Sequence, residues 1–194
     1  MKAEYTIKMV LSLALLFCLL STSIVVSASG EMHTHIKEYK GAETCLGCHH
    51  REGEDFATSI HYTWIGEATH IVGKEGKMTG KLAGVNDFCV IVESNEDLCG
   101  KCHAGYGMVE SNFSIGKIDC LICHAPNYKK TAIGPDPSID VIAAAQSVRL
   151  PTREMCLRCH ALASGGNNNK RGDLELAMGA SSLSRDLDVH MSAG

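Results

Sequence analysis

One short pattern, in which two residues separate a pair of cysteines and a histidine follows, occurs four times in this chain of 194 residues. The copies are Cys45-Leu46-Gly47-Cys48-His49, Cys99-Gly100-Lys101-Cys102-His103, Cys120-Leu121-Ile122-Cys123-His124 and Cys156-Leu157-Arg158-Cys159-His160. In one helical turn, thiols at positions i and i+3 lie on the same face, and the imidazole follows them. The group that these side chains hold therefore constrains the fold more than any other feature.

This spacing is typical of covalent c-type haem attachment, in which both thiols add to the vinyl groups of a porphyrin and the imidazole binds the iron. The sequence predicts four haem c groups. The thioether bonds would form at eight cysteines: Cys45, Cys48, Cys99, Cys102, Cys120, Cys123, Cys156 and Cys159. The proximal iron ligands would be His49, His103, His124 and His160.

Two other uses of paired cysteines compete with haem. A structural zinc site takes four ligands from paired Cys units, but it does not require the same trailing histidine in every copy. Disulfides that span only two residues are strained or catalytic rather than structural. Four such disulfides in one chain would be unusual, so the pattern favours haem.

Composition indicates how such a chain folds. Aromatic residues make up 5% of the chain and glycine occurs 19 times, so a large side-chain core is not expected. We predict a multihaem cytochrome c fold of mainly short α-helices and long irregular loops wrapped around four c-type haems, with little β-structure. Helices are expected over 43–60 and 138–148 and after an N-cap at Thr152, and the one strand over 86–92.

The first 28 residues have the pattern of a signal peptide. Lys2 and Lys8 supply positive charge, an apolar run covers 9–26, and small residues precede a predicted cleavage after Ala28. The competing interpretation is an uncleaved membrane anchor. We expect a tetrahaem domain over 29–194, exported to the periplasm or the cell surface. The net charge of −4, without a basic run, argues against nucleic-acid binding.

The sixth ligand of each iron separates electron transfer from catalysis, because two strong protein ligands leave no position for a substrate. Of the six remaining histidines, His61 is the best candidate for a distal ligand, followed by His70 and His190. His50 directly follows a proximal ligand. His33 and His35 rank lowest, because the start of a mature chain is commonly disordered.

Several runs, most of them outside the haem motifs, resemble the octahaem tetrathionate reductase family, and the resemblance covers nearly all of the chain from Gly41. They are Ser59–Trp64, Asn86–Cys89, Ser94–Glu96, Gly105–Gly107, Ile118–His124, Tyr128–Lys130, Pro151–Arg153, Lys170–Leu174 and Leu187–Met191.

The resemblance implies a chain of bis-His haems and one haem with a lysine as distal ligand, where sulfur or nitrogen oxyanions can be reduced. Lys170 matches that lysine, Cys89 matches a thiol near that haem, and Asn86 matches a polar neighbour. Taken alone, Lys170 would be interpreted as a solvated loop residue. Cys89 would be a small buried apolar residue or a thiol free to pair.

The family has four further haem motifs, so we interpret this chain as the N-terminal part of a longer octahaem protein, with a natural four-haem relative as the alternative. Two functions remain. The first is electron transfer through four haems, with redox proteins or a membrane quinol-oxidising complex as partners. The second is a part in a tetrathionate reductase-like enzyme that acts on a small oxyanion.

Overall fold

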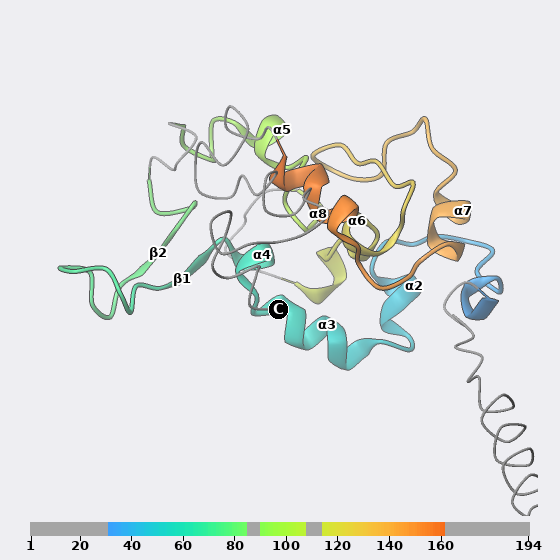
Figure 1. The fold of residues 1–194 in the computed structure, drawn as a ribbon, viewed down its shortest axis with the longest axis horizontal. Coiled ribbons are helices and arrows are strands. Elements are labelled where there is room, and N and C mark those ends of the chain that lie inside the picture. Colours follow the sequence, from blue (N-terminus) through green and yellow to red (C-terminus); the bar gives the residue numbers. More distant parts are fainter. Residues whose placement is uncertain (1–30, 85–89, 108–113, 162–194) are drawn as a thin grey trace, which may run out of the picture.

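The computed structural model describes residues 31–84, 90–107 and 114–161. Short helices and loops dominate these residues, together with one small sheet (Figure 1). The elements are η1 Glu31–His33, α2 Glu43–Leu46, α3 His50–Ala57, α4 Ile60–Thr63, β1 Ile65–Glu67, β2 Met78–Gly80, α5 Glu96–Cys99, η2 Ile115–Lys117, α6 Cys120–His124, α7 Val141–Gln146 and α8 Arg153–His160. The predicted class of short helices and irregular loops agrees with this arrangement.

The single helix predicted over 43–60 is wrong, because the structure divides this segment into α2, α3 and α4. The first break follows Gly47, the C-cap of α2, and at His49 the backbone leaves helical geometry with φ −114° and ψ 40°. The second break lies at Ser59, which is extended. The first haem motif thus lies across the junction between two helices.

The start of α8, predicted at Thr152, is confirmed by its capping bond, and α7 begins with a similar cap. The Thr152 side chain accepts a hydrogen bond from the Met155 amide at the start of α8. At the start of α7, the Asp140 side chain accepts one from the Ala143 amide. Such caps satisfy amides that have no partner inside the helix. The helix predicted over 138–148 is therefore present but shorter, as α7.

The sheet lies elsewhere than predicted. Residues 85–89 fall outside the described residues, and Val90–Val92 do not form a strand. Instead, β1 and β2 pair antiparallel, with Ile65 opposite Gly80, and form a hairpin that projects from the rest of the described fold (Figure 1). Gly80 has φ +154°, and a Cβ there would lie 2.2 Å from the Trp64 carbonyl oxygen, so the pairing needs glycine.

Many of the buried apolar residues among the described segments are alanines. One cluster joins Ile36, Leu121, Ile122 and Tyr128 with four alanines, and a second joins Ala42, Tyr62 and Ile118. Small side chains bury little apolar area, so these clusters contribute limited hydrophobic stabilisation. Within the described segments, no helix is long and apolar enough to span a membrane.

Candidate functional site

Each of the four motifs forms a helical turn, as the sequence predicted. The third motif is α6 itself, and the fourth lies within α8. In the first and second motifs, the histidine amide donates to the carbonyl oxygen of the first cysteine, at 2.9 Å for His49 and 3.1 Å for His103. Both thiols of a motif therefore lie on one side of its turn.

Thiols from different motifs are neighbours. The Cys45 and Cys120 thiols are close enough to shift each other's pKa, downward for Cys45 and upward for Cys120. The Cys159 thiol donates to the Cys102 carbonyl oxygen at 3.8 Å, and this neighbouring thiol lowers the pKa of Cys102 to about 6. The fold thus brings the first motif to the third and the second to the fourth.

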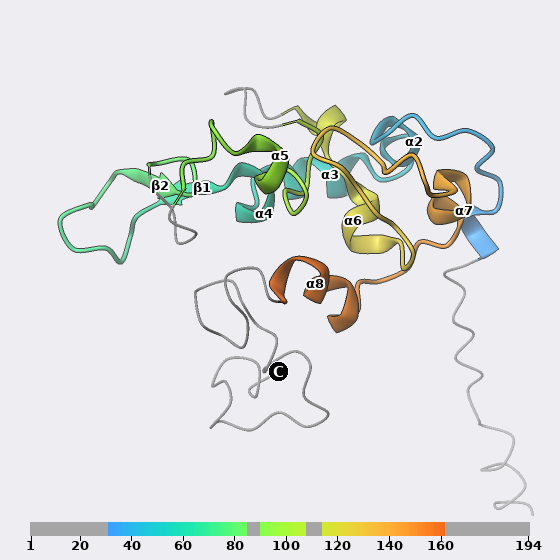
Figure 2. The same cartoon turned by 90° about the horizontal axis from the view of Figure 1, so that it is seen from above.

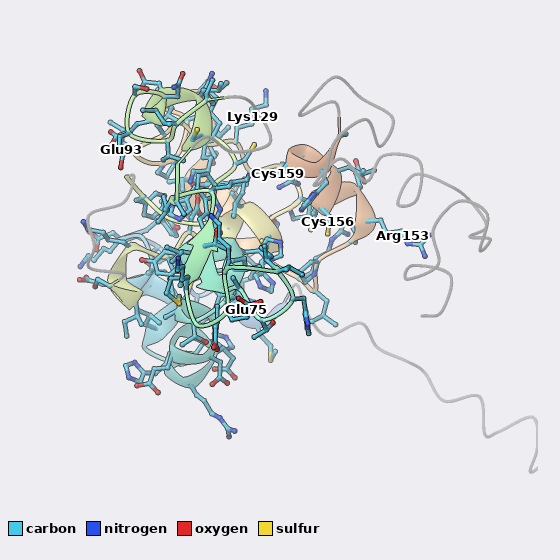
Figure 3. All side chains as sticks on the ribbon, turned by 90° about the vertical axis from the view of Figure 1, so that its left-hand side faces the viewer. Glu75, Glu93, Lys129, Arg153, Cys156 and Cys159 are labelled. Carbon is cyan, nitrogen blue, oxygen red and sulfur yellow. The ribbon has the colours of Figure 1, made fainter. Side chains whose placement is uncertain are left out.

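The third and fourth motifs are also neighbours, because α8 packs against α6 (Figure 2). Burial is the largest cause that raises the pKa of the Cys123 thiol, and the nearby Cys156 raises this pKa further. Figure 3 shows Cys156 and Cys159 on α8. All four motifs are therefore linked through neighbouring thiols.

Two histidine pairs bring a ring from outside the motifs next to a motif ring. The His61 and His160 ring centroids are 6.1 Å apart, with the planes at 82°. Those of His33 and His49 are 6.3 Å apart, with the planes at 29°. A metal–imidazole nitrogen bond is about 2 Å, and the ring centroid lies roughly 1 Å further, so two imidazoles on one metal have centroids roughly 6 Å apart. Both pairs match this spacing.

His103 differs from the other motif histidines because it is buried, at 3% exposure. Its Nε2 donates a hydrogen bond to the Tyr62 carbonyl oxygen at 2.7 Å. The Tyr62 ring stacks on the imidazole at 5.7 Å between centroids, and Trp64 meets it edge-on at 4.7 Å. Burial lowers the pKa of His103, so the imidazole is held neutral.

A buried polar cluster joins the segments that follow the second motif and precede the third. Asp119 accepts hydrogen bonds from the hydroxyls of Tyr128 at 3.0 Å and Tyr106 at 3.2 Å, and Tyr39 bonds to Tyr106 at 2.7 Å. The Lys130 ammonium lies 3.6 Å from the Asp119 carboxylate. Burial raises the pKa of Asp119 and lowers that of Lys130.

The ammonium of Lys130 also donates to the carbonyl oxygens of His103 and Gly105, both at 2.6 Å. Asp119 directly precedes Cys120 of the third motif, and His103 ends the second motif. Because Lys130 contacts both residues, its side chain connects these two haem motifs. The cluster therefore fixes the second motif relative to the third.

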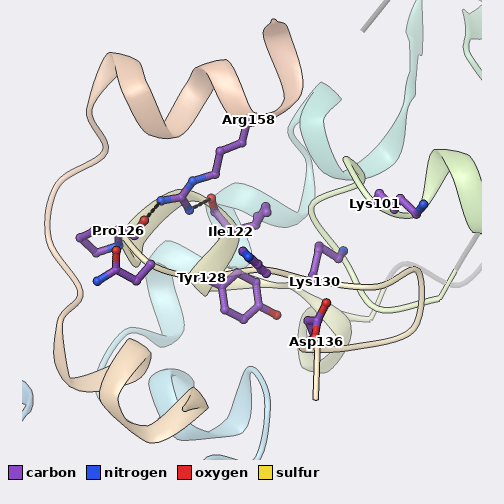
Figure 4. A pocket seen from close by; sticks show the side chains of 9 residues that line it. Lys101, Ile122, Pro126, Tyr128, Lys130, Asp136 and Arg158 are labelled. Carbon is purple, nitrogen blue, oxygen red and sulfur yellow. Dashed lines mark hydrogen bonds between the residues drawn. The ribbon is translucent and has the colours of Figure 1, made fainter. Parts of the chain in front are cut away.

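A cavity of about 670 Å³ opens between three of the motifs (Figure 4). Lys101 lines it from the second motif, Ile122 from the third and Arg158 from the fourth. The other lining residues are Pro126, Asn127, Tyr128, Lys129, Lys130 and Asp136.

Comparison with known proteins gives two similar chains. An uncharacterized protein of Archaeoglobus fulgidus is 29% identical over 215 residues, which cover 82% of this chain and 72% of that protein. The octaheme cytochrome c from Shewanella oneidensis, known from a crystal structure, superposes with a TM-score of 0.63 at 33% identity. This chain shares the fold of part of a multihaem cytochrome c.

The match to the Shewanella cytochrome covers 83% of this chain but only 38% of that cytochrome. This chain therefore spans well under half the length of the solved structure that it matches. No family model matches the chain.

Most of the described motif residues fit haem c. The eight motif cysteines are free thiols. The His124 Nδ1 lies 2.9 Å from the Arg149 carbonyl oxygen, which can only accept, so Nδ1 carries the proton and Nε2 remains for a metal. The second motif fits less well, because His103 uses its Nε2 for the bond to Tyr62, which must break before iron can bind there.

A metal ion could also be bound by protein side chains alone, without a porphyrin. The described segments bring no group of three or more His, Cys, Asp or Glu side chains together in a way that could hold a metal ion. Structural zinc requires four such ligands.

The other predicted site residues have different outcomes. Lys170, Cys89, Asn86 and His190 lie outside the described residues, so their roles stay predictions. His70 is exposed, on the loop that joins β1 to β2. His33, which the sequence ranked lowest, lies beside His49, and this pairing was missed.

Proposed function

We propose that this chain is an exported c-type cytochrome that transfers electrons through four covalently bound haems. The observation that carries the proposal is the proximity of thiols from different motifs, Cys45 with Cys120 and Cys102 with Cys159. A thioether bond holds the porphyrin edge next to its sulfur, so haems tethered at neighbouring sulfurs are close to each other. Neighbouring haems are what serial electron transfer requires.

The histidine pairs would hold the iron of two of these haems. His49 and His33 would bind the iron of the first haem, and His160 and His61 that of the fourth. Two imidazoles on one iron close both axial positions, which suits electron transfer rather than substrate binding. Haem c, when bound, supplies reversible one-electron chemistry of iron, and the chain sets its ligands, burial and nearby charge.

A spectroelectrochemical titration of the mature protein tests this function. We expect the reduced protein to show a c-type absorption spectrum and to take up four electrons per chain reversibly. The chain should also exchange these electrons with a soluble redox mediator. A protein that binds haem but is reduced by fewer than four electrons would contradict the proposal.

The chain's second candidate function, a part in oxyanion reduction, rests on Lys170 and on the sequence resemblance. Its test is reoxidation of the reduced protein by tetrathionate. Loss of that reoxidation in Lys170→Met, with the haem content unchanged, would support a reductase. Electron paramagnetic resonance that shows only bis-His low-spin irons would exclude it.

A further inference from the structure

Arg158 lies between the two cysteines of the fourth motif, yet its guanidinium reaches the third motif. One terminal nitrogen donates to the Ala125 carbonyl oxygen at 2.8 Å and to that of Ile122 at 3.4 Å. The other donates to the carbonyl oxygen of Pro126. Figure 4 shows this side chain spanning from α8 to the end of α6.

Ile122 lies in α6, Ala125 is its C-cap and Pro126 follows the cap. A short helix leaves the carbonyl groups near its C-terminus without internal partners, and Arg158 donates to this region. A guanidinium suits them because its planar fork directs several donors at once, which the single ammonium of lysine cannot copy. Arg158 therefore closes the end of α6, the helix that carries Cys120, Cys123 and His124.

A second link joins the same two segments. The imidazole of His124 donates through Nδ1 to the carbonyl oxygen of Arg149, in the segment between α7 and α8. The proximal histidine of the third motif is thus oriented by the chain that leads into the fourth motif. The segment 149–158 is therefore bonded to the third motif or its C-cap at both ends. The Arg149 carbonyl oxygen accepts from His124 at one end, and the Arg158 guanidinium donates to Ala125 at the other.

We propose that Arg158 is a positioning residue that fixes the third and fourth haem motifs as one rigid pair and raises the reduction potentials of both haems. This inference rests on the proposed haem function. Reduction adds a negative charge to a haem, and a fixed cation nearby stabilises that charge. Both roles follow from one guanidinium held between α6 and α8.

Two substitutions separate the roles. Arg158→Met removes both the charge and the donors. Arg158→Lys keeps the charge but loses the fork. The matched control is Arg153→Met, which removes an arginine from the same helix, where the side chain is exposed and extends away from α6 in Figure 3.

The experiment uses the haem-loaded full chain. Spectroelectrochemical titration measures the midpoint potentials, and amide hydrogen exchange measures local opening of α6 and α8. In Arg158→Met we expect two of the four midpoints to fall and exchange in these helices to become about tenfold faster or more, from the loss of hydrogen bonds to a charged group. In Arg158→Lys we expect near-native midpoints with faster exchange. Arg153→Met should change neither.

Unchanged midpoints and exchange in a haem-loaded Arg158→Met would overturn the inference and leave the proposed function intact. Equal shifts in Arg153→Met would also overturn it. If Arg158→Met does not fold, Arg158→Lys decides, because wild-type exchange in that variant would contradict the positioning role. A wild-type protein without haem would refute the proposed function itself.

Discussion

The imidazoles of His61 and His160 lie nearly perpendicular to each other, with ring centroids 6.1 Å apart. His61 lies on α4 and His160 ends α8, so the pairing depends on the tertiary fold. Burial lowers the pKa of His61, with a further contribution from His160. The neutral form, which binds metals, is therefore favoured.

Replacing His61 tests this pair. His61→Ala should leave one haem with an open axial position, so that one of four irons becomes high-spin. Electron paramagnetic resonance and the absorption spectrum of the oxidised protein measure this change. His70→Ala removes an exposed histidine from the hairpin and should leave the spin states unchanged. Four low-spin irons in His61→Ala would contradict the assignment.

The first haem should respond in the same way to His33. His33→Ala is expected to produce one high-spin iron, because the ring 6.3 Å from His49 is lost. His35→Ala is the matched control, since that exposed ring instead bonds through Nδ1 to the Met32 carbonyl oxygen at 2.8 Å. Indistinguishable spectra of the two variants would argue against His33 as a ligand.

The position of His33 beside His49 could not be predicted from local sequence. Its segment is held by a distant residue, because the Gln146 amide donates to the Ile36 carbonyl oxygen at 2.7 Å. Nothing in the pattern around His33 indicates that bond. The general expectation of a disordered start therefore did not predict the position of His33, whose role as a ligand stays a prediction.

Other features were predictable because they depend on neighbours in sequence. The helical turns of the four motifs and the Thr152 cap follow from local spacing, and the structure contains them. The hairpin was missed because β1 and β2 contain glycine and lack a clear apolar alternation. Its register depends on the contact between Gly80 and Trp64. Among the described residues, the surprises therefore arise from tertiary contacts.

The buried pair of Lys130 and Asp119 should be important for stability. Both side chains are almost fully buried, at 1% and 0% exposure. Lys130→Met leaves the carboxylate without its cation, and removing one partner of a buried ion pair costs about 3–5 kcal/mol. Urea unfolding near neutral pH measures this loss. Lys129→Met, at an exposed position, is the control and should change the free energy of unfolding little.

The stability of Lys130→Met should also depend on pH differently from that of the wild type. Burial already raises the pKa of Asp119, and Lys130 opposes that rise, so its removal raises the pKa further. A carboxyl whose pKa is raised by folding binds its proton more tightly in the folded state, so stability is lost as pH rises through that pKa. The difference in the free energy of unfolding between wild type and Lys130→Met should therefore become smaller at acidic pH. A gap that widens on acidification would show that this assignment is wrong.

Two glycines in matching backbone positions should differ in how well they tolerate substitution by alanine. Gly47 and Gly100 both cap a motif helix with helical dihedral angles. A Cβ at Gly100 would lie 2.7 Å from the Ala132 Cβ, whereas nothing lies within 4 Å of one at Gly47. Gly100→Ala should cost roughly 1–3 kcal/mol through overpacking. Gly47→Ala should be neutral or slightly stabilising. Denaturant unfolding compares them, and equal stabilities would contradict the packing.

The number of haems per mature chain tests the central claim most directly. The protein should be matured in a host that attaches haem c, and its haem content measured by the pyridine haemochrome spectrum and by the intact mass. We predict four covalently bound haems, and three when Cys45 and Cys48 are both replaced by serine. Fewer than four haems in the wild-type chain, or a colourless protein, would contradict the account.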